Sequence, residues 1–92
     1  MLDFSFINDE QPAHSRQSSY AGGIEYEEFV KAQELKIVEI HLDYYGKFRW
    51  SSLQVKQKRE ALTPTISALI PNLATLLKQA FAGNCGLVAS GD

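Results

Sequence analysis

The sequence predicts a small α+β domain in which helices pack on a three-stranded antiparallel sheet. Two observations lead to this class: residues 38–55 alternate between apolar and polar like a β-hairpin, and residues 64–82 carry apolar residues at helical spacing. A third is length, because 92 residues make one domain near the lower size at which a hydrophobic core alone suffices. We therefore expect a single domain over residues 1–83.

The hairpin is predicted from a two-residue period that runs on both sides of Gly46. The apolar positions are Val38, Ile40, Leu42 and Tyr44 before the glycine, and Phe48 and Trp50 after it. Such alternation is typical of half-buried strands, and a glycine suits the turn between them. One extra residue at Ser51 and Ser52 keeps Val55 in register and would form a β-bulge. The predicted hairpin therefore spans residues 38–55.

An all-α fold is the alternative, because many of the same residues also follow helical spacing. The positions at this spacing are Tyr26, Phe29, Val30, Gln33, Ile37, Ile40, His41 and Tyr44. One long helix would then span residues 25–45 and end at Gly46, and a second would span residues 64–82. We prefer the hairpin, because strand-favouring residues stand on both sides of the glycine.

The residues before the hairpin are expected to form a strand, a loop and a helix in turn. Leu2, Phe4 and Phe6 alternate with polar residues, and a third strand would stabilise an otherwise marginal two-stranded ribbon. Residues 8–23 are polar and aperiodic, so we expect an irregular, disordered loop. A helix then runs from near Glu25 to near Glu34, since acidic residues favour a helix start.

The C-terminal helix is predicted from its ends as well as from its spacing. Thr63 and Pro64 suit the N-cap and first positions, and Gly83 suits the position after the last turn. Pro71 removes a backbone hydrogen bond, so we expect the helix to kink or split there. Residues 84–92 are small and glycine-rich, which predicts a flexible tail.

Charge is unevenly distributed along the chain, although its net value is only −2. Residues 1–43 hold nine acidic and three basic residues, whereas residues 44–91 hold six basic residues and one acidic residue. The two halves either neutralise each other or present oppositely charged faces. No apolar run reaches the length of a membrane span, the N-terminus does not resemble a signal peptide, and Cys85 has no second cysteine to pair with. These features predict a cytoplasmic protein.

No catalytic residue, metal site or cofactor site is predicted. Cys85 follows a helix C-terminus, where the helix dipole raises the pKa of a thiol rather than lowering it. His41 and Asp43 share one face of the predicted strand, which we interpret as an ordinary exposed polar face. His14, His41 and Cys85 follow no metal-ligand spacing, and no phosphate-binding or dinucleotide-binding motif occurs. We therefore expect a protein that is not an enzyme.

The hairpin turn is the candidate binding site, because aromatic and cationic residues gather there. The predicted partner-binding residues are Tyr45, Lys47, Arg49 and Trp50. Tyrosine, tryptophan and arginine dominate protein interfaces, although alternation equally places Trp50 and Phe48 in the core. The leading hypothesis is a small adaptor or inhibitor that occupies a surface of another protein; immunity proteins, antitoxins and phage-encoded inhibitors are analogous in size and composition only. An open sheet edge could also pair with a strand of the partner or of a second copy, forming a homodimer.

A small nucleic-acid-binding regulator is the alternative function. It would use Lys47, Arg49, Trp50, Lys56, Lys58 and Arg59. Cations can contact phosphates while an aromatic ring stacks on a base. The acidic balance of the whole chain argues against this hypothesis.

Overall fold

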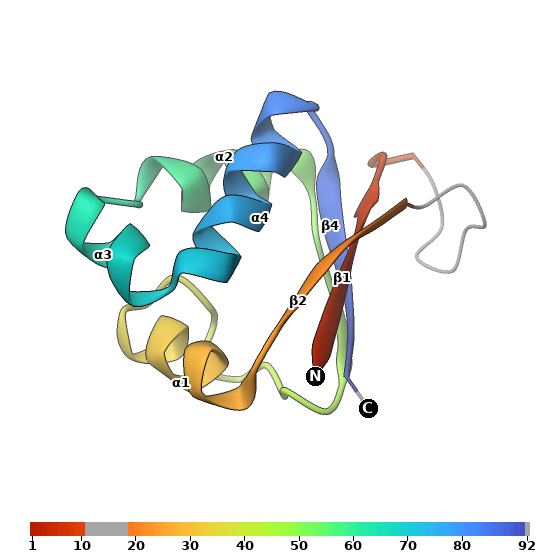
Figure 1. Ribbon diagram of the computed structural model, residues 1–92. Helices are drawn as coiled ribbons and strands as arrows, with labels where there is room; N and C mark the ends of the chain where they lie inside the picture. The colour runs from red at the N-terminus through yellow and green to blue at the C-terminus, as the bar shows by residue number, and fades with distance from the viewer. Residues whose placement is uncertain (11–18, 92) are drawn as a thin grey trace.

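In the computed structural model, which describes residues 1–10 and 19–91, helices pack on a four-stranded antiparallel sheet (Figure 1). The strands are β1 (Leu2–Ile7), β2 (Ser19–Ile24), β3 (Lys47–Trp50) and β4 (Gly86–Gly91). The helices are α1 (Tyr26–Glu34), α2 (Ser52–Glu60), α3 (Pro64–Leu69) and α4 (Pro71–Ala82). The α+β class is therefore confirmed, with four strands in place of the expected three.

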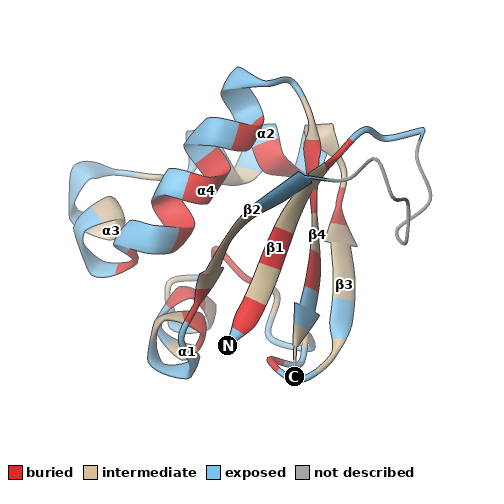
Figure 2. Cartoon of the chain, turned by 45° about the vertical axis from the view of Figure 1, so that its right-hand side comes forward, coloured by how far each residue is buried: buried red, intermediate tan, exposed pale blue. Residues whose placement is uncertain are grey.

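The strands lie in the order β2-β1-β4-β3, and α2 and α4 lie on one side of this sheet (Figure 1). Register decides which residues face the helices. One helix-facing row consists of Phe4, Ala89 and Phe48, and the next consists of Phe6, Leu87 and Trp50. The row between them on the open face consists of Ser5, Val88 and Arg49. Figure 2 shows buried and intermediate positions alternating along the first part of β1, as expected of a sheet with one covered face.

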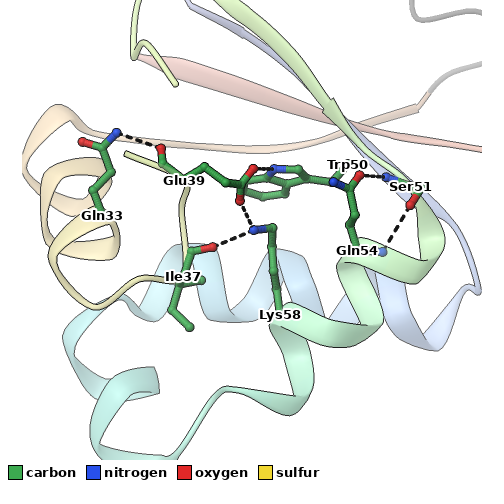
Figure 3. A network of polar contacts seen from close by, with 7 residues as sticks. All are labelled: Gln33, Ile37, Glu39, Trp50, Ser51, Gln54 and Lys58. Atoms are coloured by element: carbon green, nitrogen blue, oxygen red, sulfur yellow. Dashed lines mark hydrogen bonds and ion pairs between the residues drawn. The ribbon is translucent and has the colours of Figure 1, made fainter. Parts of the chain in front are cut away.

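The hairpin predicted over residues 38–55 is wrong. Only residues 47–50 of that range form a strand, which pairs with β4, whereas residues 38–46 form a loop and residues 52–60 form α2. Ser51 begins the helix: its hydroxyl accepts from the Gln54 N–H, and the Gln54 side chain accepts from the Ser51 N–H (Figure 3). This reciprocal pair is a capping box. The hairpin that does form consists of β1 and β2.

The alternative of one helix over residues 25–45 is also wrong. The helix begins beside Glu25 and ends at Glu34, as the preferred prediction stated. Lys36 then takes a positive φ of 63°, which reverses the chain. The N–H groups of Ile37 and Val38 both donate to the Ala32 carbonyl, at 2.9 and 3.2 Å. The chain therefore folds back along α1 instead of continuing it.

The C-terminal helix splits at Pro71 into α3 and α4, as expected. The Thr63 hydroxyl caps α3 by accepting from the Ile66 N–H. The helix α4 supplies five buried core residues: Leu73, Ala74, Leu76, Leu77 and Ala80. In the part of the chain that is described, no helix is both long and apolar enough to cross a membrane.

Two segments predicted to lack regular structure form strands instead. Residues 19–24 form β2, although the prediction included residues 8–23 in one loop; residues 11–18 of that loop lie outside the described residues. Residues 86–91 form β4, between β1 and β3, so the prediction of a flexible tail over 84–92 is wrong for them. Small residues are needed here: a side chain at Gly86 or Gly91 would collide with the backbone of the residues beside it.

Candidate functional site

The loop between α1 and β3 holds a large apolar side chain in solvent. We call residues 36–42 the braced loop. Ile40 lies in it with 86 % of its surface exposed, whereas Ile37 and Val38 are buried beneath. Three separate sets of hydrogen bonds hold the braced loop to the rest of the fold, the first being the two bonds to Ala32 described above.

The second set comes from one side chain of α1. The Gln33 amide nitrogen donates to the carbonyl oxygens of Glu39 at 3.2 Å, Ile40 at 3.4 Å and Leu42 at 3.1 Å. The three acceptors are the carbonyl of Ile40 itself and carbonyls before and after it in the chain. Because one amide group serves carbonyls on both sides of Ile40, it fixes the course of the chain through the tip of the loop.

The third set joins the braced loop to β3 and α2 through Glu39 (Figure 3). One Glu39 carboxylate oxygen accepts from the Trp50 indole N–H at 3.2 Å, and the other pairs with the Lys58 ammonium. Lys58 also donates to the Ile37 carbonyl at 2.8 Å and lies 4.6 Å from the centre of the Trp50 ring. The partly buried Lys58 therefore holds two points of the loop at once.

The network lowers the pKa of Glu39 below its ordinary value of 4.5. Burial opposes this change by disfavouring the charged form, but the hydrogen bond and the charge of Lys58, together with the Trp50 N–H, outweigh it. A carboxylate whose pKa is lowered in the folded state contributes stability above its unfolded pKa and loses that contribution as pH falls through the folded pKa.

Stability should therefore depend on Glu39 only when it is charged. We expect wild type to be more stable than Glu39→Gln above about pH 4.5, and the difference to disappear as pH falls further. Urea unfolding of both proteins between pH 7 and pH 3 measures this difference in the free energy of unfolding. Glu27→Gln is the matched control, since Glu27 is an exposed residue of α1. A difference that stays constant down to pH 3 would contradict the role of the Glu39 charge.

Two exposed tyrosines, Tyr26 and Tyr45, contact Tyr44, which follows the braced loop in the chain. Tyr26 and Tyr45 are 53 % and 63 % exposed, and their rings stack with centres 6.5 Å apart. Both rings also contact the buried Tyr44, whose hydroxyl donates to the Ile24 carbonyl. We call Tyr26, Ile40 and Tyr45 the loop surface. The backbone at each of these residues is held by hydrogen bonds: Tyr26 lies in α1, the Ile40 carbonyl accepts from Gln33, and the Tyr45 N–H donates to the Asp43 carboxylate.

Hollows lie on both sides of the braced loop. One of about 320 Å³ lies towards α2 and is lined by Lys36, Ile37, Glu39, Gln54, Gln57, Lys58 and Ala61. Another of about 420 Å³ lies towards α1 and is lined by Gln33, Glu34, Lys36, Val38, Glu39 and Ile40. Because the two share Lys36 and Glu39, the loop forms a ridge between them.

The structure separates the four residues predicted to bind a partner. Tyr45 and Lys47 are exposed, as a contact residue must be. The Arg49 side chain donates to the carbonyls of Asn8 and Asp9, at 2.7 and 2.9 Å, and so holds the chain after β1. Trp50 is 1 % exposed and lies in the core, where the alternation also allowed it to be. Trp50 is thus not accessible to a partner in this structure.

The residues predicted for nucleic-acid binding do not form a stacking platform, because the Trp50 ring is covered. The Lys58 charge is paired with Glu39, and the Arg59 guanidinium lies 5.2 Å from the centre of the Phe81 ring. Lys56 is exposed on α2, whereas Lys47 and Arg49 lie on β3. Those cations therefore come from two elements, and Lys58 is already neutralised.

The residues considered for catalysis remain apart. Burial raises the pKa of the Cys85 thiol, which confirms the predicted direction, although the helix dipole was the expected cause. His41 is exposed in the loop, and the strand face that would have paired it with Asp43 is not formed. His14 lies outside the described residues. Within residues 1–10 and 19–91, no group of three or more potential ligand side chains is placed to hold a metal ion.

Sequence reasoning missed the residues that brace the loop, namely Gln33, Glu39 and Lys58. Gln33 and Glu39 looked like ordinary polar residues of a helix or strand, and Lys58 was assigned only to the nucleic-acid-binding alternative. No local pattern marks the contact between Glu39 and Lys58, which are 19 positions apart. Comparisons of the chain with protein-family models, curated proteins and solved structures find no match. The functional assignment therefore depends on the geometry of this site.

Proposed function

We propose that this protein is a non-enzymatic binding module, a small adaptor or inhibitor, that occupies another protein's surface with its loop surface. The observation that carries the proposal is Ile40: its side chain is 86 % exposed, yet the loop that carries it is held by hydrogen bonds on both sides. Folding gains little from an apolar side chain left in water. Burial of Ile40 by a partner would remove this apolar surface from water and so favour binding.

The bracing of the loop favours binding because it lowers the entropic cost of association. A loop that is already fixed in one conformation loses less freedom when it docks than a mobile loop does. Tyr26 and Tyr45 add large exposed aromatic area, and the rings of both contact the buried Tyr44. Tyrosine is enriched among the interface residues that contribute most to affinity.

The charges around the loop surface indicate the chemistry of the partner. Exposed acidic residues belong to the same segments of the chain, namely Glu25, Glu27 and Glu34 in and beside α1 and Asp43 in the loop. The exposed bases Lys31 and Lys36 offset only part of this charge. We propose a partner with an apolar pocket for Ile40 and a basic rim, since opposite charges steer association and favour the correct partner.

The test is capture of the partner by variants of the loop surface. The tagged protein is mixed with lysate of the cells that encode it, with and without nuclease treatment, and the dominant protein captured in both cases is then purified for titration. Ile40→Asp and Tyr45→Ala should each raise its Kd at least about tenfold, because each removes about 1.4 kcal/mol or more of contact energy. Tyr20→Ala is the matched control, because Tyr20 is 64 % exposed but lies on β2.

Two outcomes would contradict the proposal. Equal Kd values for wild type, Ile40→Asp and Tyr45→Ala would show that the loop surface is not part of the interface. Recovery that depends on nucleic acid and vanishes after nuclease treatment would favour the nucleic-acid-binding alternative, and such binding should also weaken steeply with added salt.

A further inference from the structure

The two edges of the sheet differ in how they resist pairing with another strand. The β3 edge has four residues and includes Lys47 and Arg49, and charged side chains of this kind discourage edge-to-edge pairing. The β2 edge has six residues, from Ser19 to Ile24, with no charge and no proline. Among the described residues, Ser19–Gly23 make backbone hydrogen bonds only to β1.

We infer that β2 pairs antiparallel with β2 of a second copy, about a two-fold axis between Ala21 and Gly22. The two sheets then form one continuous sheet across the dimer. This inference does not depend on the proposed function, because β2 carries none of the residues of the loop surface.

The register with β1 supports this axis. Tyr20 and Gly23 lie opposite Ser5 and Asp3, so both belong to the open face of the sheet. The proposed axis places Tyr20 of one copy opposite Gly23 of the other, which matches open face to open face. A shift of one residue in either direction would place Tyr20 opposite a residue of the helix-covered face, which an antiparallel pair does not allow.

The pair formed by Ser19 and Ile24 also matches residues of the same sheet face. Ser19 and Ile24 lie opposite Phe6 and Leu2, whose side chains belong to the helix-covered face. The axis places Ser19 of one copy opposite Ile24 of the other. Ala21 is the extra residue at the irregularity between Phe4 and Ser5, and it lies at the axis. All six residues of β2 thus find a partner in this one register.

The side chains on the open face are also complementary in size. Tyr20 is 64 % exposed, and Gly23 has no side chain of its own, so a ring from the second copy would lie over the Met1 side chain that covers Gly23. The Met1 thioether occupies the position that a side chain on Gly23 would take. Sulfur makes favourable contacts with aromatic rings. Neither strand brings a charge to the axis, so no like charges meet when the copies pair.

Sedimentation equilibrium over a range of concentrations tests the dimer with the intact chain. We expect the mass to rise from one chain to two, and Tyr20→Lys to weaken the association at least tenfold. Tyr45→Lys is the matched control, because Tyr45 is 63 % exposed on the loop surface, and it should associate like wild type. A wild type that stays monomeric at millimolar concentration, or an equal loss in both variants, would overturn the inference.

Disulfide trapping then tests the register. In a Cys85→Ser background, chains with Tyr20→Cys and chains with Gly23→Cys should cross-link when mixed, since paired residues lie about 4.5–5.5 Å apart. Tyr20→Cys alone should cross-link little, because two such residues lie three positions apart, or about 10 Å along the strands. Preferential cross-linking of Tyr20→Cys with itself, or of a Lys47→Cys control on β3, would overturn the inference.

The two proposals fail separately. Tyr20→Lys should abolish self-association and leave capture of the partner intact, whereas Tyr45→Ala should weaken capture and leave self-association intact. Each variant therefore serves as the control of the other.

Discussion

Deletion of residues 84–92 is expected to unfold the protein. These residues include β4, which pairs with β1 on one side and β3 on the other. Without it, β3 loses its partner strand in the sheet, and the core loses the buried Leu87 and Ala89. The far-ultraviolet circular dichroism and the amide NMR spectrum of residues 1–83 should therefore be those of an unfolded or poorly ordered chain.

Ser90→Ala in the complete chain is the control for this deletion. The Ser90 side chain is exposed, and the substitution keeps the backbone of β4. It should change the free energy of unfolding by no more than about 0.5 kcal/mol. If residues 1–83 alone melted cooperatively near the wild-type temperature, the segment would be the flexible tail that its composition suggested.

Trp50→Ala is expected to lower the free energy of unfolding by about 3–5 kcal/mol. The Trp50 ring is 1 % exposed and lies 5.7 Å from the ring centre of Phe4 and 5.3 Å from that of Phe48. Its loss leaves a cavity in the core and also removes the indole N–H that the Glu39 carboxylate accepts. Urea unfolding at pH 7 measures the effect.

Tyr45→Ala is the control for Trp50→Ala, because Tyr45 is an exposed aromatic residue of the same segment. It should cost less than about 1 kcal/mol, as surface substitutions usually do. If the two substitutions cost the same, Trp50 would be a surface residue, and the core interpretation of the alternating segment would be wrong.

Local signals in the sequence predicted several elements with their ends. Thr63 and Pro71 marked the start and the break of the C-terminal helix, and both work as expected. Glu25 marked the start of α1, and the alternation of Leu2 and Phe4 marked β1. In each case the signal comes from residues that neighbour one another in the chain, so no distant contact has to be known.

The loop between α1 and β3 shows where such signals fail. Its alternation matches that of a strand, but Ile40 is exposed and the backbone is held by side chains of α1 and α2. Distant hydrogen bonds from Gln33 and Lys58 select the loop over the strand, and no periodic pattern encodes them. One local signal was available, because Ser51 followed by Gln54 matches a capping box.

The glycines near the C-terminus were misinterpreted for a related reason. Gly86 and Gly91 suggested flexibility, but they allow the backbones at Trp50 and Tyr44 to approach β4 closely. The requirement for glycine at these positions becomes visible only in the folded structure, where the backbones of distant residues lie beside them. The same dependence on distant neighbours applies to the residues predicted to bind a partner: Tyr45 and Lys47 are exposed, whereas the burial of Trp50 followed from which element paired with β3.

The central claim is that the braced loop presents Ile40 on a fixed backbone, and NMR relaxation tests it most directly. The order parameters of the amides of residues 39–42 should be about 0.85 in wild type, as in regular secondary structure. They should fall in Gln33→Ala, which removes the amide that donates to Glu39, Ile40 and Leu42. Wild-type values below about 0.6 would show a mobile loop and contradict the account.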